Sequence, residues 1–160
     1  MAPGKNIEIF DFKRSDLGEL SSLTHSYFTE LRDYDDAIEF AEGWEAYYRR
    51  LMESGIGSPH FFIRGLRVDG ETAGFIMFGY RDEPMWQKRR RGYLSNIYVA
   101  PSHRREGLGS LMVEGALQTL KQSDVEVVDL DVYVTNRAGR RFWETFGFSP
   151  FKERLRLNMA

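Results

Sequence analysis

The sequence predicts an α/β protein in which a mixed, mostly antiparallel sheet carries helices on both faces. Short segments with period-two alternation of apolar residues are separated by segments with helical spacing, and the strands outnumber those of a pure doubly wound fold. The chain has 160 residues, 42% of them hydrophobic, which is enough for one buried core, and it has no linker-like tract. We therefore expect residues 1–160 to form one domain.

The first third of the chain predicts one strand followed by two helices. Isoleucines alternate with polar residues between Asn6 and Phe12, which is typical of a strand. Ser15 or Asp16 is a suitable cap for a helix from Leu17 to Leu31. Apolar residues at helical spacing indicate a second helix over 36–52.

The middle of the chain predicts a hairpin, a further strand and a helix. Strands over 61–68 and 72–80 flank an Asp-Gly turn, which is a strong hairpin signal. A charged connection over 81–91 leads to a strand over 93–99, which Pro101 ends. A glycine-bearing turn then opens a helix over 108–122.

The last third predicts a buried strand, a short helix and a return to strands. Residues 125–134 are apolar enough for a strand that is covered on both faces. Asn136 can cap a helix that ends at Phe146, and Gly147 suits a left-handed stop. Residues 148–157 alternate again and predict one or two closing strands.

Composition excludes several classes of protein. No apolar run approaches the roughly 18 residues that span a bilayer, and the charged first dozen residues do not fit a signal peptide. The chain has no cysteine and three scattered histidines, so we expect neither disulfides nor a metal site. A reducing cytoplasm is the expected location, with no membrane partner.

Charge is distributed unevenly along a chain whose net charge is −2. Residues 1–80 hold 8 Lys/Arg against 14 Asp/Glu, and residues 81–160 hold 14 against 10. The run Lys88-Arg89-Arg90-Arg91 could contact phosphates, but it is short and lacks a module of stacking aromatic residues. We therefore expect no nucleic-acid partner, and interpret the run as a solvated turn or an aid to binding a phosphate.

The most informative segment is Arg104-Arg105-Glu106-Gly107-Leu108-Gly109, which lies between a strand and an amphipathic helix. The first N–H groups of a helix have no partner within the helix and carry partial positive charge, so a pyrophosphate would fit here. The segment is neither a P-loop, since GxxxxGK[ST] is absent, nor a Rossmann fingerprint, since Met112 replaces its last glycine. A plain turn before a helix is the alternative.

Several further signals accompany this RxxGxG turn. They are Ile97-Tyr98-Val99-Ala100-Pro101 at the strand end, Leu130-x-Val132 in the next strand, then Asn136 and Gly147-Phe148. Together they make residues 93–148 resemble the acetyl-CoA-binding core of the GCN5-related N-acetyltransferases (GNAT), and the order of elements upstream is similar too. The resemblance implies the acyl-CoA N-acyltransferase fold, with central strands 93–99 and 125–134 splayed apart, and acetyl-CoA as the acyl donor.

The resemblance also implies where CoA binds. Amides of the turn would hold the pyrophosphate, and the pantetheine arm would pair with backbone freed by a bulge and the splay. The candidate cofactor-binding residues are Ile97, Tyr98, Val99, Arg104, Arg105, Glu106, Gly107, Leu108, Gly109, Ser110, Asn136 and Trp143.

The candidate catalytic residues are Ile97 and Asn136, which the resemblance implies, and Tyr133, which could replace a tyrosine that the family has and this sequence lacks. The Ile97 amide would stabilise the oxyanion that forms on the acetyl group. Trp143 stands where the family places the tyrosine that protonates the thiolate, and an indole cannot do this. Tyr133, Tyr98 or water could replace it, while Trp143 would line the channel or simply pack in the core. Asn136 would contact the CoA arm, cap a helix, or do both.

The base that deprotonates the amine is less clear from the sequence. Tyr93 occupies the place where some family members have a glutamate, and Glu83 and Asp131 are acidic alternatives. We therefore expect the base to act through a water molecule. Because no cysteine is available for an acyl-enzyme, we expect direct transfer in a ternary complex.

The acceptor side is predicted from the first two helices and their connection, which shape the acceptor pocket in the family. Acidic and aromatic side chains together suit a cationic amine, either a small molecule or a lysine-type amine, although a solvated helix face is the alternative. The residues are Glu30, Asp33, Asp35, Asp36, Glu39 and Glu42, with Tyr27, Phe28, Tyr34 and Trp44. A non-catalytic acyl-CoA-binding module is the rival function, and a homodimer is compatible with either.

Overall fold

The computed structural model describes residues 4–159, which contain one five-stranded sheet in the order β1-β2-β3-β4-β5. All neighbouring strands are antiparallel except β4 and β5, which are parallel. The mixed, mostly antiparallel sheet is therefore confirmed. The strands are β1 (Ile7–Asp11), β2 (Phe61–Val68), β3 (Glu71–Asp82), β4 (Arg90–Val99) and β5 (Val127–Leu130).

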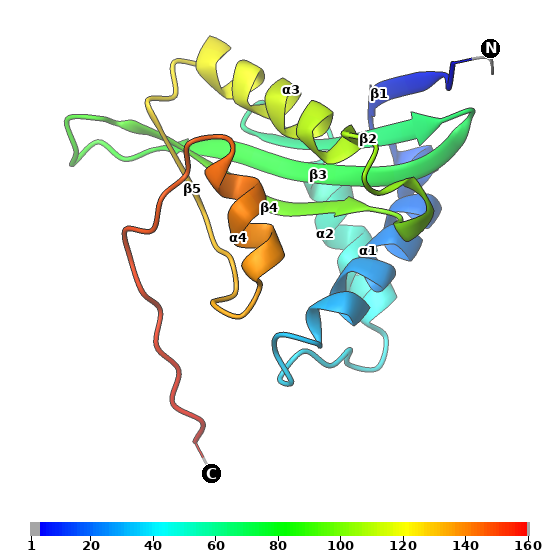
Figure 1. The fold of residues 1–160 in the computed structure, drawn as a ribbon, viewed down its shortest axis with the longest axis horizontal. Helices are drawn as coiled ribbons and strands as arrows, with labels where there is room; N and C mark the ends of the chain where they lie inside the picture. Colours follow the sequence, from blue (N-terminus) through cyan, green and yellow to red (C-terminus); the bar gives the residue numbers. More distant parts are fainter. Residues whose placement is uncertain (1–3, 160) are drawn as a thin grey trace.

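Helices cover both faces of this sheet (Figure 1). The helices α1 (Leu17–Leu31) and α2 (Trp44–Gly55) lie on one face, and α3 (Leu108–Gln122) and α4 (Arg137–Glu144) lie on the other. Each layer has its own apolar core: Phe75 and Tyr98 are buried under α1, whereas Ile76 and Phe78 are buried under α3. None of the helices within residues 4–159 is long and apolar enough to cross a membrane.

A bulge in β4 determines how this strand meets its neighbours. Met77 pairs with Asn96 but Phe78 pairs with Leu94, so Ser95 is an extra residue in β4. The Ser95 hydroxyl donates a hydrogen bond to the Met77 carbonyl oxygen at 3.1 Å. Bulges bend the strand and increase its twist. The second half of β4 therefore turns away from β5.

The splay between β4 and β5 begins at this bulge. Their parallel pairing runs from Arg91 opposite Val127 to Leu94 opposite Leu130 and stops there, although β4 continues to Val99. The predicted strand over 125–134 is consequently too long, because beyond Leu130 the chain has lost its ladder partner. The predicted splay between these two segments is present.

The predicted second helix over 36–52 starts too early, since α2 begins at Trp44. The Asp35 carboxylate accepts a hydrogen bond from the Ala37 N–H at 3.1 Å, which ties the backbone into a turn. Such local side-chain bonds compete with helix formation. Gly43, with φ of +73°, then sets the direction of the chain before α2.

The predicted closing strands over 148–157 are absent from the described part of the chain. Residues 149–159 are extended but have no ladder partner, and Figure 1 shows them leaving the sheet beyond α4. Strand geometry needs a neighbouring strand, and the alternation of the sequence cannot say where that neighbour is. As a result, β5 is the last strand of the sheet and its outer edge is open.

Candidate active site

The turn before α3 presents main-chain N–H groups at a helix start. Gly107 adopts a left-handed φ of +77° and precedes the helix. The first bond of the i→i−4 ladder runs from the Leu111 N–H to the Gly107 carbonyl oxygen at 3.1 Å, so the N–H groups of Leu108, Gly109 and Ser110 precede that ladder. This arrangement suits a phosphate or pyrophosphate.

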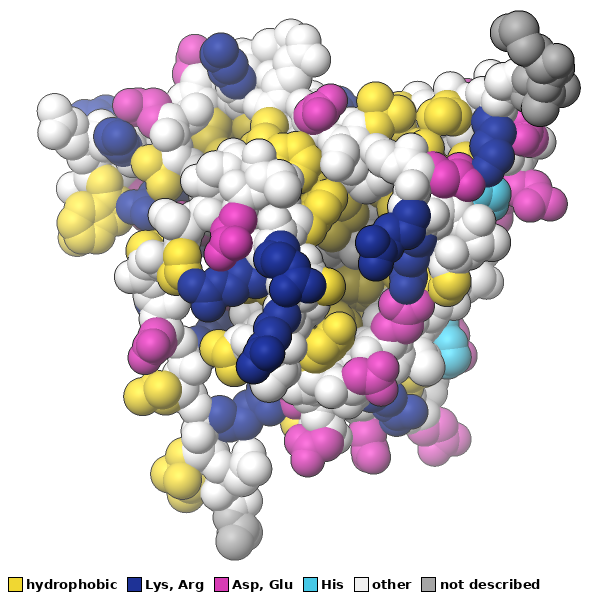
Figure 2. All heavy atoms as spheres, viewed as in Figure 1, with side chains coloured by type: hydrophobic (Ala, Val, Ile, Leu, Met, Phe, Trp, Pro, Cys, Tyr) yellow, Lys and Arg dark blue, Asp and Glu magenta, His cyan; other side chains and the backbone are white. Residues whose placement is uncertain are grey.

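A cleft of about 500 Å³ lies over this turn and connects it to the end of β4. Figure 2 shows the hollow between Lys and Arg side chains over α4 and over the turn before α3. Most of the predicted cofactor-binding residues line it, namely Ile97, Tyr98, Val99, Arg104, Arg105, Gly107, Leu108, Gly109, Ser110 and Asn136. Glu106 is outside this lining and binds Lys5 Nζ at 2.6 Å instead.

A second cavity of about 120 Å³ fills the gap where β4 and β5 separate. Its walls include Asn96 of β4 and Trp143 of α4, and also Tyr133. Both cavities share four lining residues: Tyr27, Leu31, Ile97 and Asn136. The two cavities are therefore adjacent, and we call them together the channel, from the helix start to the gap.

Arg104 lines the cleft but its guanidinium group is already engaged. Nη2 binds both carboxylate oxygens of Glu30 at 2.7 and 2.8 Å, and Nε donates to the Val99 carbonyl oxygen at 2.7 Å. This contact joins α1 to the turn across 74 positions of sequence. The positive charge of Arg104 is thus largely neutralised beside the cleft, which the sequence did not indicate.

Asp35 is a buried carboxylate at the rim of the channel. It accepts two hydrogen bonds from Arg156 at 2.7 and 2.9 Å and one from the Tyr133 hydroxyl at 3.2 Å. The hydrogen bonds from Arg156 are the main reason that the pKa of Asp35 lies far below its usual range. The ring of Tyr34 stacks on that of Tyr133, with centroids 5.9 Å apart. Sequence reasoning selected Tyr133 and Asp35 separately and missed Arg156.

The two tyrosines that line the gap between β4 and β5 keep their protons at neutral pH. Burial raises the pKa of Tyr27 to about 12. Burial is also the largest cause of the raised pKa of Tyr133, followed by the hydrogen bond to Asp35. Tyr98, the alternative proton source, has its ring in the core under α1. Among these, only Tyr27 and Tyr133 line the gap between β4 and β5.

Asn136 and Trp143 both have a structural role and also line the cavities. The Asn136 side chain caps α4 by accepting the Gly139 N–H at 2.8 Å, and the residue also lines both cavities. Trp143 is 9% exposed, packs against Phe148 in the core, and forms part of the wall of the gap.

Two candidate bases and two arginines of the basic run form ion pairs at the surface. Glu83 binds Arg81 at 2.7 Å, and Asp131 binds Arg154 at 2.9 Å. In the basic run, Arg90 binds Asp82 and Arg91 binds Asp129. No group of three or more potential metal-ligating side chains occurs within residues 4–159.

The fold and the channel define a protein that holds a phosphate-bearing ligand at a helix start and extends it into a gap between two splayed strands. The family model of the acetyltransferase (GNAT) family matches residues 20–148. The chain therefore belongs to the GNAT family, and it is an acetyl-CoA-dependent N-acyltransferase. The match confirms the family, the fold class and the acyl donor expected from the sequence.

Individual relatives and solved structures are similar to this chain, although their sequence identity to it is low. An uncharacterized N-acetyltransferase of Archaeoglobus fulgidus is 24% identical over 134 residues, covering 83% of this chain and 88% of the relative. A ribosomal-protein-alanine N-acetyltransferase from Brucella melitensis has a TM-score of 0.73 at 20% identity, with 96% and 100% of the two chains covered. The aminoglycoside N-acetyltransferase AAC(6')-Iy in complex with CoA has a TM-score of 0.77 at 14% identity, with 99% and 98% covered. These similarities do not specify an acceptor.

Proposed function

We propose that this chain transfers an acetyl group from acetyl-CoA directly to a primary amine on a cationic acceptor, either a small molecule or a lysine-type amine. The observation that supports this most is the pair of adjacent cavities, which extend from the α3 turn to a rim of acidic and aromatic side chains. The chain has no cysteine that could carry an acyl group, so both substrates must be bound together.

The donor would lie along the channel with its pyrophosphate on the amides of Leu108, Gly109 and Ser110. Gly109 supports this placement, because a methyl group in its place would have only ordinary contacts with protein atoms, the nearest being Phe142 at 3.6 Å. Absence of a side chain there leaves room for a ligand. The pantetheine arm would follow Ile97 to Val99 into the gap, where β4 is paired with β3 but no longer with β5.

The chemistry would take place in the gap between β4 and β5. The acceptor ammonium first loses one proton to water, and its free nitrogen then attacks the acetyl carbonyl carbon. The carbon–sulfur bond breaks, and the nitrogen loses a second proton, which restores the group that protonates the thiolate. The Ile97 N–H would stabilise the oxyanion. Tyr133, which is protonated at neutral pH and lines this gap, would give its proton to the departing thiolate. Asn136, which lines both cavities, would position the arm near its sulfur.

The acceptor would approach from the connection between α1 and α2. Tyr34 and Tyr133 form a stacked aromatic wall there, and such faces attract cations. Exposed carboxylates on this connection have no ion pair with any residue in 4–159, which leaves them able to attract a cation; they are Asp33, Asp36, Glu39 and Glu42. Figure 2 shows acidic side chains gathered at this end of the molecule.

A panel of amines tests the acceptor class. Acetylation of polyamines, lysine-containing peptides and aminoglycosides should exceed that of neutral or acidic amines by at least about tenfold, and added salt should narrow the difference because charge attraction is screened. Replacing Asp33 and Asp36 together with lysine should raise KM for cationic amines and leave KM for acetyl-CoA unchanged. Equal rates for neutral and cationic amines would contradict the proposed acceptor.

Tyr133→Phe tests the proton source. We expect kcat to fall about 100-fold, within the range of general acid catalysis, while KM for acetyl-CoA stays the same. Tyr34→Phe is the matched control, since it changes the stacked partner in the same way and should leave kcat within about twofold. Equal kcat values for the two variants would exclude Tyr133 as the acid.

A further inference from the structure

Asp35 is the one charged side chain that is buried within residues 4–159, and the residue is 8% exposed. Four hydrogen bonds converge on its two oxygens. Oδ1 accepts one from the Ala37 N–H at 3.1 Å, and Oδ2 accepts one from the Tyr133 hydroxyl at 3.2 Å. The guanidinium group of Arg156 donates the other two, at 2.7 and 2.9 Å. Because a buried charge is costly without a partner, this carboxylate needs a cation beside it.

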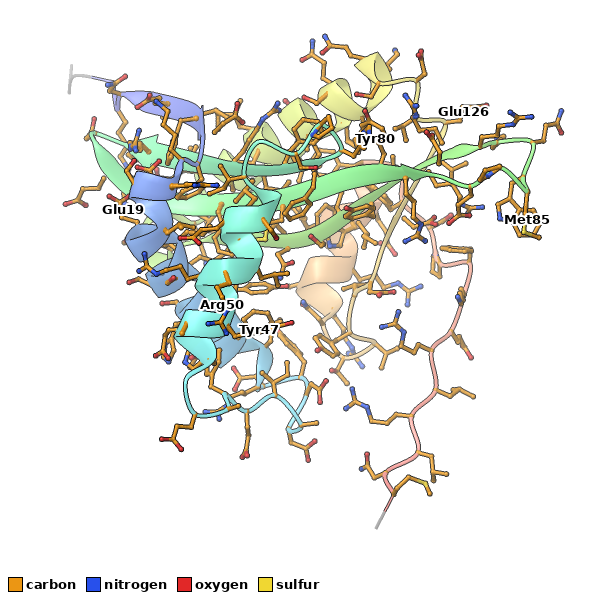
Figure 3. All side chains as sticks on the ribbon, turned by 180° about the vertical axis from the view of Figure 1, so that it is seen from behind. Glu19, Tyr47, Arg50, Tyr80, Met85 and Glu126 are labelled. Carbon is orange, nitrogen blue, oxygen red and sulfur yellow. The ribbon has the colours of Figure 1, made fainter. Side chains whose placement is uncertain are left out.

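The cation comes from a segment that is otherwise poorly attached. We call residues 149–159 the C-terminal arm. Figure 3 shows it as an extended backbone whose side chains project to both sides. The arm makes no main-chain hydrogen bond to the described chain, and the neighbours of Arg156, Leu155 and Leu157, are 89% and 81% exposed. Arg156 is therefore held on Asp35 mainly by its own guanidinium group.

The ion pair joins unequal partners. The Asp35 side chain is 7% exposed, whereas that of Arg156 is 57% exposed. An ion pair with such an exposed partner contributes little to stability, because water screens the charge and a long side chain loses freedom. The other ion pair of the arm, between Arg154 and Asp131, is 80% exposed on both sides and adds as little. Another cation can therefore replace Arg156 without disturbing the sheet.

Asp35 lies where an acceptor would enter. The Tyr133 hydroxyl that binds Asp35 belongs to a residue that lines the gap between β4 and β5. Tyr34, which stacks on Tyr133, lines the cleft. A cation on Asp35 is thus one hydrogen bond away from the wall of the channel, beside two aromatic rings that attract positive charge. An acceptor whose nitrogen lies in the gap can place a second charge there.

We propose that Asp35 binds a second cationic group of the acceptor, preferably a guanidinium group, and that Arg156 occupies this site in the free protein until the acceptor displaces it. The inference rests on the proposed function and narrows the acceptor to amines that carry a further positive charge. Arg156 indicates the preferred chemistry, because a guanidinium group presents paired N–H donors that match the two oxygens of a carboxylate. The exposed carboxylates nearby attract any cation, whereas a buried carboxylate also selects by geometry.

A matched pair of acceptors measures the preference for the second charge. One is an alkyl amine that ends in a guanidinium group, the other is a monoamine of equal length, and the preference is the ratio of their kcat/KM values. Arg156→Gln removes the competing cation and should raise this preference about two- to fivefold, the range expected for an exposed ion pair. Lys152→Gln is the matched control, because it removes the same charge from an exposed position of the same arm and should leave the preference unchanged.

Asp35→Asn distinguishes a cation site from a purely structural ion pair. Asparagine keeps an oxygen that can accept the Ala37 N–H but has no charge, so the preference should fall about fivefold or more. The two variants should thus change the preference in opposite directions. A structural pair would make them act alike, since either substitution removes the same contact. The proposal is overturned if Arg156→Gln lowers the preference or leaves it unchanged.

The second charge could be carried by a small molecule or by a peptide. Two short lysine peptides, one with arginine and one with alanine beside the lysine, are compared in the same way as the two alkyl amines. If Arg156→Gln raises the preference within either pair, the proposal is supported and the source of the charge is identified. If it raises the preference in neither pair, the proposal is wrong.

Isothermal titration separates this inference from the proposed function, because it needs no acetyl transfer. The guanidinium-bearing amine should bind Arg156→Gln about two- to fivefold more tightly than the wild type, and Lys152→Gln should match the wild type. Tighter binding without acetylation of any amine would refute the proposed function and still support the cation site. Acetylation of amines together with equal binding to wild type and Arg156→Gln would refute the cation site and leave the proposed function intact.

Discussion

Replacing Gly109 with alanine separates the stability of the fold from binding of the donor. The added methyl group would lie 3.6 Å from Phe142 and 3.9 Å from Val99, which are ordinary contacts. Alanine in a helix is favoured over glycine by about 0.5–1 kcal/mol. For a chain of this size that corresponds to a rise in Tm of about 1–4 °C, so the variant should be at least as stable as the wild type.

Binding of CoA should weaken in the same variant. The methyl group enters the cleft beside the N–H groups that would hold the pyrophosphate. Hydrogen bonds to charged groups contribute about 1.5–3 kcal/mol each, so losing one corresponds to about a 10- to 150-fold rise in Kd. Isothermal titration with CoA measures this, and differential scanning calorimetry measures Tm.

Gly115→Ala is the matched control in the same helix. A methyl group there meets no atom within 4 Å, and Gly115 does not line either cavity. It should therefore raise Tm as Gly109→Ala does and leave the Kd of CoA unchanged. If the two variants bind CoA equally well, the ligand does not approach the backbone at Gly109 and the placement of the pyrophosphate is wrong.

Three further predictions concern charge and packing. Glu30→Gln removes the ion pair of Arg104 and leaves its positive charge free beside the cleft. CoA binding should become about two- to fivefold tighter at low salt, and the gain should be smaller at high salt. Weaker binding of CoA in titrations would show instead that Glu30 positions the arginine. Asp35→Asn removes a carboxylate whose pKa is lowered on folding, so the stability that it contributes is present above about pH 4 and is lost as the pH falls further. The Tm difference between wild type and Asp35→Asn should thus be constant from about pH 5 to 7 and shrink below about pH 4; a constant difference throughout would contradict this. Trp143→Ala should destabilise the protein by about 3–5 kcal/mol in urea unfolding, whereas the half-exposed Trp86→Ala should change it by less than about 0.5 kcal/mol.

The sequence was most informative where local chemistry determines the structure. The turn that ends in Gly107 and the helix from Leu108 to Gln122 were predicted to the residue, because a left-handed glycine and an amphipathic repeat act within a few positions. The hairpin around Asp69 and Gly70 was predicted for the same reason.

Errors arose where the pattern of apolar residues does not decide the conformation. The early start of the second helix was wrong because a local hydrogen bond competes with the helix: the Asp35 side chain bonds to the backbone two residues on. The prediction of closing strands was wrong because alternation over 148–157 shows only that the segment is suited to a strand. It does not show whether a neighbouring strand is there to pair with it. The basic side chains that alternate there were the signal that could have identified Arg156 as a partner for the acidic stretch.

Contacts across the site were likewise invisible in the sequence. Arg104 and Glu30 are 74 positions apart, and nothing local to either residue predicts that they meet. The bulge at Ser95 also lacks a distinctive residue, because the irregularity depends on how β3 and β4 are paired.

That single extra residue in β4 decides which side chains belong to which layer of the protein. Leu94 before it, and Ile97 and Val99 after it, all point to the layer of α3, whereas strict alternation would have put Leu94 and Tyr98 together. Deleting Ser95 would therefore leave a regularly alternating strand in which Leu94, Ile97 and Val99 still face the layer of α3 and Tyr98 still faces the layer of α1. What the deletion would remove is the bend that accompanies the bulge, and with it the local cause of the separation between β4 and β5.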